Sequence, residues 1–120
     1  MRLILFNLLF LISFAAFANQ NKYIYEIEDS IIIVEEKEKI IVSESCFING
    51  CDALFYAKNK KIRFKDLKLN GGKNPAAAAC TQVLNGAVLM LKNSENGIQS
   101  FCLFSDGSII SNKSISFLIK

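Results

Sequence analysis

Four cysteines constrain the fold of this 120-residue chain more than any other feature of its sequence. They stand at Cys46, Cys51, Cys80 and Cys102. An even number of cysteines in a small chain is typical of a disulfide-bonded domain that folds outside the reducing cytoplasm. A zinc site is the competing use, but the spacings lack paired C-x-x-C knuckles and the sequence contains no histidine. The sequence therefore predicts disulfides, with no metal site and no cofactor.

The N-terminus carries the export signal that the disulfide interpretation requires. Arg2 precedes an apolar run from Leu3 to Phe17, and alanines stand at positions 16 and 18. A basic start, an apolar stretch and small residues before the cut are the parts of a secretory signal peptide. The run is shorter than the roughly 20 residues of a membrane span, which makes an N-terminal anchor helix the weaker alternative. We predict a signal peptide over 1–18 and a periplasmic or extracellular location.

Four cysteines allow three pairings, and the sequence alone does not choose among them. Spacing favours Cys46–Cys51, which are close along the chain, and Cys80–Cys102, which lie in one apparent structural unit. By loop-closure entropy the shorter ring contributes about 2 kcal/mol and the longer about 3 kcal/mol. Two independent disulfide rings are the expectation.

The mature chain, residues 19–120, has the size of one domain with two patterns along its length. Its first half, 19–70, is β-rich: residues 23–28 alternate, residues 31–34 are β-branched, and residues 40–42 resume the pattern after a polar turn. Residues 52–60 fit either a further strand or a short helix. We predict a meander of two or three strands here.

The second half, 74–120, combines a helix with a β-meander. Asn74 suits the N-cap and Pro75 the first helical position, and Asn85-Gly86 is a natural stop, so a helix is predicted over 75–84. Residues 87–91 read as a buried strand, followed by strands over 98–104 and from 109. The predicted fold is α+β: a small antiparallel β-sheet or sheets, one short helix packed on the sheet, and two disulfides.

Charge is segregated along the mature chain. Removing Arg2 leaves 13 basic and 11 acidic residues, a net charge of +2 that is too small to indicate nucleic-acid binding. Seven acidic residues fall within 26–44 and seven basic residues within 58–73. These segments are either two solvated surfaces that attract each other across the fold or a basic patch for an anionic partner. The candidate partner-binding residues are Lys58, Lys60, Lys61, Arg63 and Lys65.

Two motifs carry a family resemblance: Asn74-Pro75-Ala76 with Cys80 five residues after the proline, and Cys102-Leu103-Phe104-Ser105-Asp106-Gly107-Ser108. In this order and spacing, the segment 74–110 resembles the bacterial domain of unknown function 333, also labelled hemolysin-like. Ser105 stands where that family usually has proline, and Ile110 where it has a further cysteine. The resemblance implies an exported bacterial envelope protein, and it covers about a third of the mature chain.

The residue types disfavour catalysis. Without histidine, the usual general base near neutral pH and the Ser-His-Asp and Cys-His pairs are missing, and no catalytic residue is assigned. Asp106 and Gly107 are interpreted as a turn and Asn74 and Pro75 as a helix start, all structural roles.

The function that these observations favour is a non-enzymatic envelope or secreted binding module. Its partner would be an envelope protein or a cell-wall polymer, with no transmembrane span in the mature chain. Two alternatives stay open: a membrane-lytic, hemolysin-like factor, and a hydrolase of the envelope that depends on carboxylates or lysine.

Overall fold

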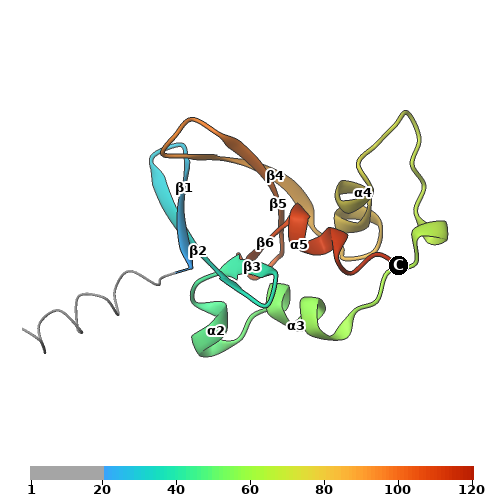
Figure 1. The fold of residues 1–120 in the computed structure, drawn as a ribbon, viewed down its shortest axis with the longest axis horizontal. Coiled ribbons are helices and arrows are strands. Elements are labelled where there is room, and N and C mark those ends of the chain that lie inside the picture. The colour runs from blue at the N-terminus through green and yellow to red at the C-terminus, as the bar shows by residue number, and fades with distance from the viewer. Residues whose placement is uncertain (1–20) are drawn as a thin grey trace, which may run out of the picture.

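The computed structural model describes residues 21–120, so the predicted signal peptide, 1–18, lies outside the described residues. The dominant element is a closed antiparallel barrel with the strand order β1-β2-β3-β6-β5-β4 (Figure 1). The strands are β1 (Lys22–Ile27), β2 (Ser30–Lys37), β3 (Ile40–Ser43), β4 (Ala87–Asn93), β5 (Ile98–Leu103) and β6 (Ile109–Ser111).

The barrel is built from two three-stranded meanders, β1–β3 and β4–β6, joined at two short seams. At one seam β1 pairs with β4, with Glu26 opposite Lys92, and at the other β3 pairs with β6, with Val42 opposite Ile110. The α+β class, the antiparallel strands and the two disulfides are confirmed, whereas the predicted sheet or sheets are in fact one closed barrel. Each meander has two free edges, and the edges of one satisfy the edges of the other.

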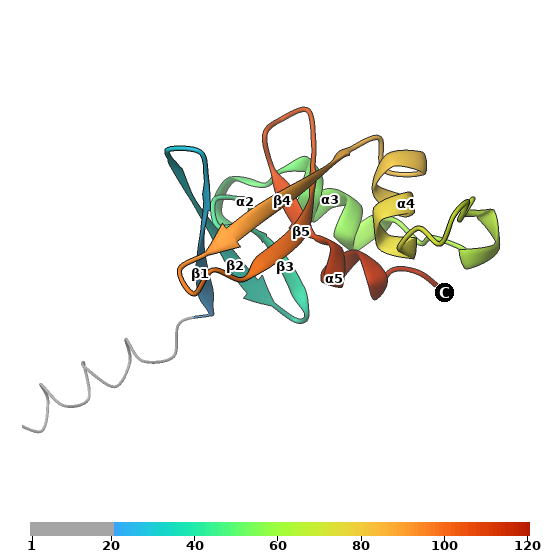
Figure 2. The ribbon, with the colours of Figure 1, turned by 90° about the horizontal axis from the view of Figure 1, so that it is seen from above.

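Five short helical elements within residues 21–120 surround one side of the barrel: α2 (Cys46–Asn49), α3 (Asp52–Asn59), η1 (Phe64–Asp66), α4 (Pro75–Gln82) and α5 (Asn112–Ser116). The expectation of one helix was therefore incomplete, and residues 52–59 take the helical alternative. In Figures 1 and 2 the strands β1 and β2 lie at one end of the molecule and α4 at the other.

Successive side chains along each strand point into and out of the barrel, and this alternation produces two apolar clusters. Phe101 and Ile109 point into the barrel, whereas their neighbours Cys102 and Ile110 point out toward the helices. The lumen cluster consists of Val34, Leu91, Phe101 and Ile109. The larger cluster lies between the outer face of the barrel and the helices, and it contains buried residues of α3, α4 and α5.

The prediction of a buried strand over 87–91 was wrong for three of its five residues, at positions 87, 88 and 90, which are exposed. Leu91 lies in the lumen, but Val88 and Met90 are 41% and 57% exposed. A run of apolar residues predicts a strand covered on both faces, and here the helices leave the outer face of β4 uncovered.

Helix α4 shows how local signals and packing agree. Asn74 Oδ1 accepts hydrogen bonds from the N–H groups of Ala76 and Ala77 at 2.8 and 3.4 Å, with Pro75 at the first helical position. The helix ends at Gln82, two residues before the predicted end at 84, and Asn85 follows with a left-handed φ of 57° while the Gly86 N–H donates to the Cys80 carbonyl.

Candidate functional site

The candidate partner-binding residues lie on one continuous stretch of chain, here called the basic segment: Lys58, Lys60, Lys61, Arg63 and Lys65. Lys58 is in the last turn of α3, and Lys60 follows it as the C-cap residue. The N–H of Ile62 donates to the Leu118 carbonyl and the N–H of Lys120 to the Ile62 carbonyl, at 3.1 and 2.9 Å. This pairing with the C-terminal residues holds residues 60–63 extended between α3 and η1, the short helix that contains Lys65.

Successive side chains of these extended residues point in opposite directions, which separates the charged side chains from the apolar side chain of Ile62. Ile62 is buried, at 2% exposure, whereas Lys61 and Arg63 on either side are exposed. The remaining lysines of the basic segment are exposed as well. Burial of Ile62 therefore fixes the backbone and directs the neighbouring cations into solvent.

Most cations of the basic segment have no acidic partner. Arg63 pairs with Asp66 through Nε at 2.9 Å, but within residues 21–120 the lysines at 58, 60, 61 and 65 form no ion pair. The other ion pairs found, Lys22–Glu44 and Lys37–Glu35, involve the acidic segment, residues 26–44. The two charged segments thus form no ion pair with each other in the described part of the chain, and their attraction across the fold stays a prediction.

Lys58 stands between two depressions in the surface, and it lines both together with Leu54. One, of about 490 Å³, runs along α3 beside Asp52 and Phe55. The other, of about 540 Å³, separates α3 from the β2–β3 turn and is lined by Glu36 and Glu38 as well as Phe47 of α2. Lys58 of the basic segment thus shares a depression with the acidic segment, although it pairs with none of its carboxylates.

Two exposed aromatic side chains accompany the cations, and the sequence patterns did not identify them. Phe55 on α3 is 60% exposed and Phe64, between Arg63 and Lys65, is 51% exposed. An isolated phenylalanine in a chain of 52% hydrophobic residues reads as core, so only its place in the fold shows that it is free for contact. Cations interleaved with aromatic rings can hold an anionic partner that also has apolar surface.

Asp106 and Gly107 have a structural role that reaches beyond their own turn. Asp106 Oδ1 accepts hydrogen bonds from the N–H and the hydroxyl of Ser108 at 2.9 and 2.6 Å, and Gly107 has a left-handed φ of 88°. Asp106 Oδ2 accepts from the N–H of Asp52 at 2.9 Å, and Ser108 Oγ from the N–H of Ala53 at 3.1 Å. The β5–β6 turn therefore caps α3, which carries Phe55 and Lys58.

The hydrogen bonds also set the charge state of Asp106. Partial burial alone raises the pKa of this carboxyl, but hydrogen bonds from the N–H of Asp52 and from Ser108 outweigh it, and the pKa is lowered. A carboxylate held ionised, with both oxygens occupied, is suited to capping and not to proton transfer.

The cysteines supply no nucleophile among the described residues. Cys46 is bonded to Cys51 and Cys80 to Cys102, the pairing that spacing favoured, and no cysteine is free in this part of the chain. Nor do three or more cysteine, aspartate or glutamate side chains gather to hold a metal ion within residues 21–120. Asn74 and Pro75 lie at the start of α4, on an element separate from the basic segment.

The fold and the surface together define a small, disulfide-bonded α+β barrel protein with a basic, partly aromatic edge. Over residues 21–120, every helix is too short or too polar to cross a membrane. Comparison with protein-family models, curated proteins and solved structures finds no match for this chain. The resemblance of 74–110 to domain of unknown function 333 stays a prediction.

Proposed function

We propose that this protein is an exported, non-enzymatic binding module that holds an anionic cell-wall polymer along its basic segment. The observation that carries the proposal is the row of four exposed lysines at 58, 60, 61 and 65 that form no ion pair within residues 21–120. Unpaired cations on one strip of surface concentrate positive potential locally, even though the whole chain is close to neutral.

The shape of the surface favours a polymer as the partner. The middle of the basic segment, residues 60–63, is extended between α3 and η1, and the cations of the segment are exposed on the surface instead of converging on a closed cavity. A linear polyanion can contact such a row repeatedly, with Phe55 and Phe64 packing against its less polar parts. The acidic surface of an envelope protein is the other partner that this charge pattern would attract, and binding tests can separate the two.

The direct test is binding to purified cell walls before and after chemical removal of their anionic polymer. Changing Lys60, Lys61 and Arg63 to glutamate reverses three charges, and we expect it to weaken binding by more than about tenfold, or roughly 1.4 kcal/mol. The matched control changes Lys39, Lys92 and Lys113, three exposed lysines outside residues 58–73, to glutamate. It carries the same change in net charge and should retain most of the binding.

Salt and wall composition provide the remaining arms of this test. Binding through exposed cations should weaken as ionic strength rises, because screening shortens the range of the attraction. Equal loss in both triple variants, or unchanged binding to walls stripped of anionic polymer, would remove the basic segment from the proposal. The lytic and hydrolytic alternatives stay predictions, which dye release from liposomes and turnover of a peptidoglycan substrate would test.

A further inference from the structure

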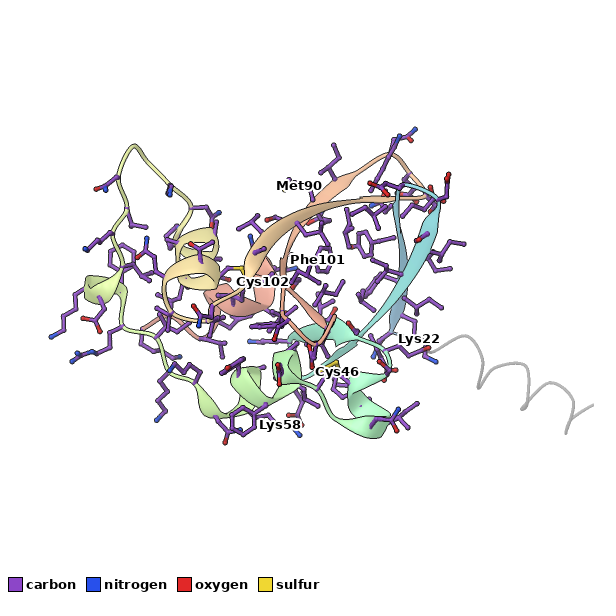
Figure 3. All side chains as sticks on the ribbon, turned by 180° about the vertical axis from the view of Figure 1, so that it is seen from behind. Lys22, Cys46, Lys58, Met90, Phe101 and Cys102 are labelled. Carbon is purple, nitrogen blue, oxygen red and sulfur yellow. A yellow bond between two sulfur atoms is a disulfide. The ribbon has the colours of Figure 1, made fainter. Side chains whose placement is uncertain are left out.

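The depression that runs along α3 beside Asp52 and Phe55, here called the α3 depression, has the size of a small-ligand site. Its volume of about 490 Å³ lies within the range of about 300–1,000 Å³ in which proteins hold small molecules. It is open to solvent and lies between the end of α2 and one side of α3. Figure 3 shows Cys46 of α2 and Lys58 of α3 together below the barrel.

Phe55 gives the α3 depression an aromatic surface that is held in place. The centroid of its ring lies 5.8 Å from that of Tyr56, with the two rings 72° apart. The Tyr56 ring in turn lies 5.3 Å from the ring of Phe104, which is buried. This row of rings runs from the core to the surface and positions Phe55, although 60% of Phe55 is exposed. An exposed, positioned ring offers a face against which the C–H groups of a ligand can pack.

The polar side chains around Phe55 carry hydrogen-bonding groups that the fold does not use. Asp52, Phe55, Lys58 and Asn59 lie three or four residues apart, on one side of α3. Within residues 21–120, the side chains of Asn49, Asp52 and Lys58 form no hydrogen bond and no ion pair. Asn59 donates through Nδ2 to the Phe55 carbonyl at 2.8 Å, which leaves its Oδ1 as an acceptor. The ring is thus bordered by both donors and acceptors.

The backbone on both sides of the α3 depression is fixed before any ligand arrives. On one side, the Cys46–Cys51 disulfide closes the ring that carries Asn49 and Gly50. Gly50 has a left-handed φ of 76°, and no atom lies within 4 Å of the place where its Cβ would be, so the depression is open at this end. On the other side, Asp106 caps α3. A site that is already ordered loses less conformational freedom when it binds.

We propose that the α3 depression binds a neutral sugar ring of a cell-wall glycan, with Phe55 packed against one face of the sugar. A sugar ring has C–H groups on its faces and hydroxyls around its rim, and each hydroxyl both donates and accepts hydrogen bonds. An aromatic ring bordered by amides, a carboxylate and an ammonium group is complementary to that arrangement.

Other classes of ligand fit the α3 depression less well. A wholly apolar ligand would cover the polar groups of Asp52 and Asn59 without bonding them, which costs free energy. A small anion would face the Asp52 carboxylate at close range. The inference deepens the proposed function and rests on it for the source of the sugar, because the same cell-wall polymer would supply both the anionic groups and the sugar.

The experiment is an NMR titration of the oxidised protein with two neutral probes, a β-linked tetramer of glucose and one of N-acetylglucosamine. We expect saturable shifts at the amides of Asn49, Asp52, Phe55 and Asn59, with a Kd of roughly 1 mM for the better probe. Phe55→Ala should weaken binding at least about tenfold, whereas Phe55→Tyr keeps an aromatic ring and should keep the binding. Phe64→Ala is the matched control, because it removes an exposed ring that lies outside the α3 depression.

The variant with Lys60, Lys61 and Arg63 changed to glutamate separates this inference from the proposed function, because none of the three lines the α3 depression. It should bind the sugar probes as the wild type does while it loses binding to cell walls. Sugar binding together with undiminished wall binding in this variant would contradict only the proposed function.

The sugar inference has its own contrary outcomes. The absence of saturable shifts with both probes at about 10 mM overturns it and does not affect binding through the basic segment. Binding that survives Phe55→Ala, or shifts centred on another surface, overturns it as well. A phenol probe that binds at the same amides more tightly than either sugar would identify an aromatic ligand instead.

Discussion

Helices α3 and α4 both pack on the outer face of the barrel, but the contacts that hold them there differ in kind. Cys80 in α4 is bonded to Cys102 in β5, and both residues are inaccessible to solvent. The first N–H groups of α3 instead donate hydrogen bonds to Asp106 and Ser108 in the β5–β6 turn. The disulfide before α3, Cys46–Cys51, closes a ring between α2 and α3 and does not join α3 to the barrel. One attachment is covalent and buried, whereas the other is polar, with one exposed and one buried hydrogen bond.

This contrast indicates which part of the molecule is rigid and which can respond to its surroundings. The buried residues of α4 are alanines and a bonded cysteine, which allow close approach to the barrel and do not titrate. The attachment of α3 depends on an ionised carboxylate, and α3 is also the helix that carries Phe55 and Lys58 of the candidate surface. Four measurements test this difference between the attachments of α3 and α4.

The largest effect is expected from changing Cys80 and Cys102 together to alanine. The lost cross-link alone should lower the free energy of unfolding by about 3 kcal/mol, because it closes the longer ring and its sulfurs fill buried space. Chemical denaturation would measure this loss. Changing Cys46 and Cys51 together is the matched control and should cost about 2 kcal/mol; an equal or larger cost would reverse the comparison.

Gly86→Ala tests how closely the barrel and the α4 disulfide approach each other. A Cβ at this position would lie 2.3 Å from Cys102 Sγ and 3.0 Å from the Leu103 carbonyl oxygen. Overpacking of this kind costs about 1–3 kcal/mol, which should appear as a lower melting temperature. Gly97→Ala is the control, since a Cβ there meets only the side chain of Asn93. Equal melting temperatures for the Gly86→Ala and Gly97→Ala variants would show that the atoms around position 86 move aside at little cost.

Asp106→Ala should loosen α3 and leave α4 intact. The change removes the acceptor for the N–H of Asp52, and the loss of a helix cap costs about 1 kcal/mol. Hydrogen exchange should quicken at the amides of Asp52 and Ala53 while the amides of α4 keep their protection. Asp29→Ala, in the exposed β1–β2 turn, should leave both helices unchanged. Uniform loss of protection would show that α3 and α4 are not independently held.

The smallest effect is a pH dependence confined to the α3 attachment. The folded-state pKa of Asp106 is lowered from its ordinary value of 3.8. The stability that its hydrogen bonds add is complete above the ordinary pKa and is lost as pH falls through the lowered one. NMR titration of the Asp106 carboxyl should place its midpoint below 3.8. A midpoint at or above that value would contradict the capping role.

What the sequence predicted correctly was set by local chemistry. Asn74 and Pro75 mark the start of α4 and Asn85 follows its end, all through contacts within a few residues. The close spacing of Cys46 and Cys51 along the chain favoured their pairing. Turn residues likewise marked most strand ends. Each of these features depends on neighbours along the chain, which the sequence displays directly.

What the sequence did not predict depends on distant parts of the chain. Closure of the barrel requires the first meander to meet the second, and the cap of α3 comes from Asp106, 54 residues later. Phe55 and Met90 are exposed because no helix covers them, and a hydrophobic pattern in the sequence does not show which side chains the helices cover. The basic segment was visible as a run of charges, but only the fold shows that its lysines have no carboxylate partners within residues 21–120.

The seams of the barrel also determine the order in which this chain can finish folding. The first meander, β1–β3, is synthesised with both outer edges unpaired, because their partners β4 and β6 come much later in the chain. Pairings between such distant segments form slowly, and an open strand edge can meanwhile pair with another chain. Before β6 is synthesised and paired, the newly made protein can therefore aggregate through the open strand edges of its first meander. The finished barrel no longer exposes these edges.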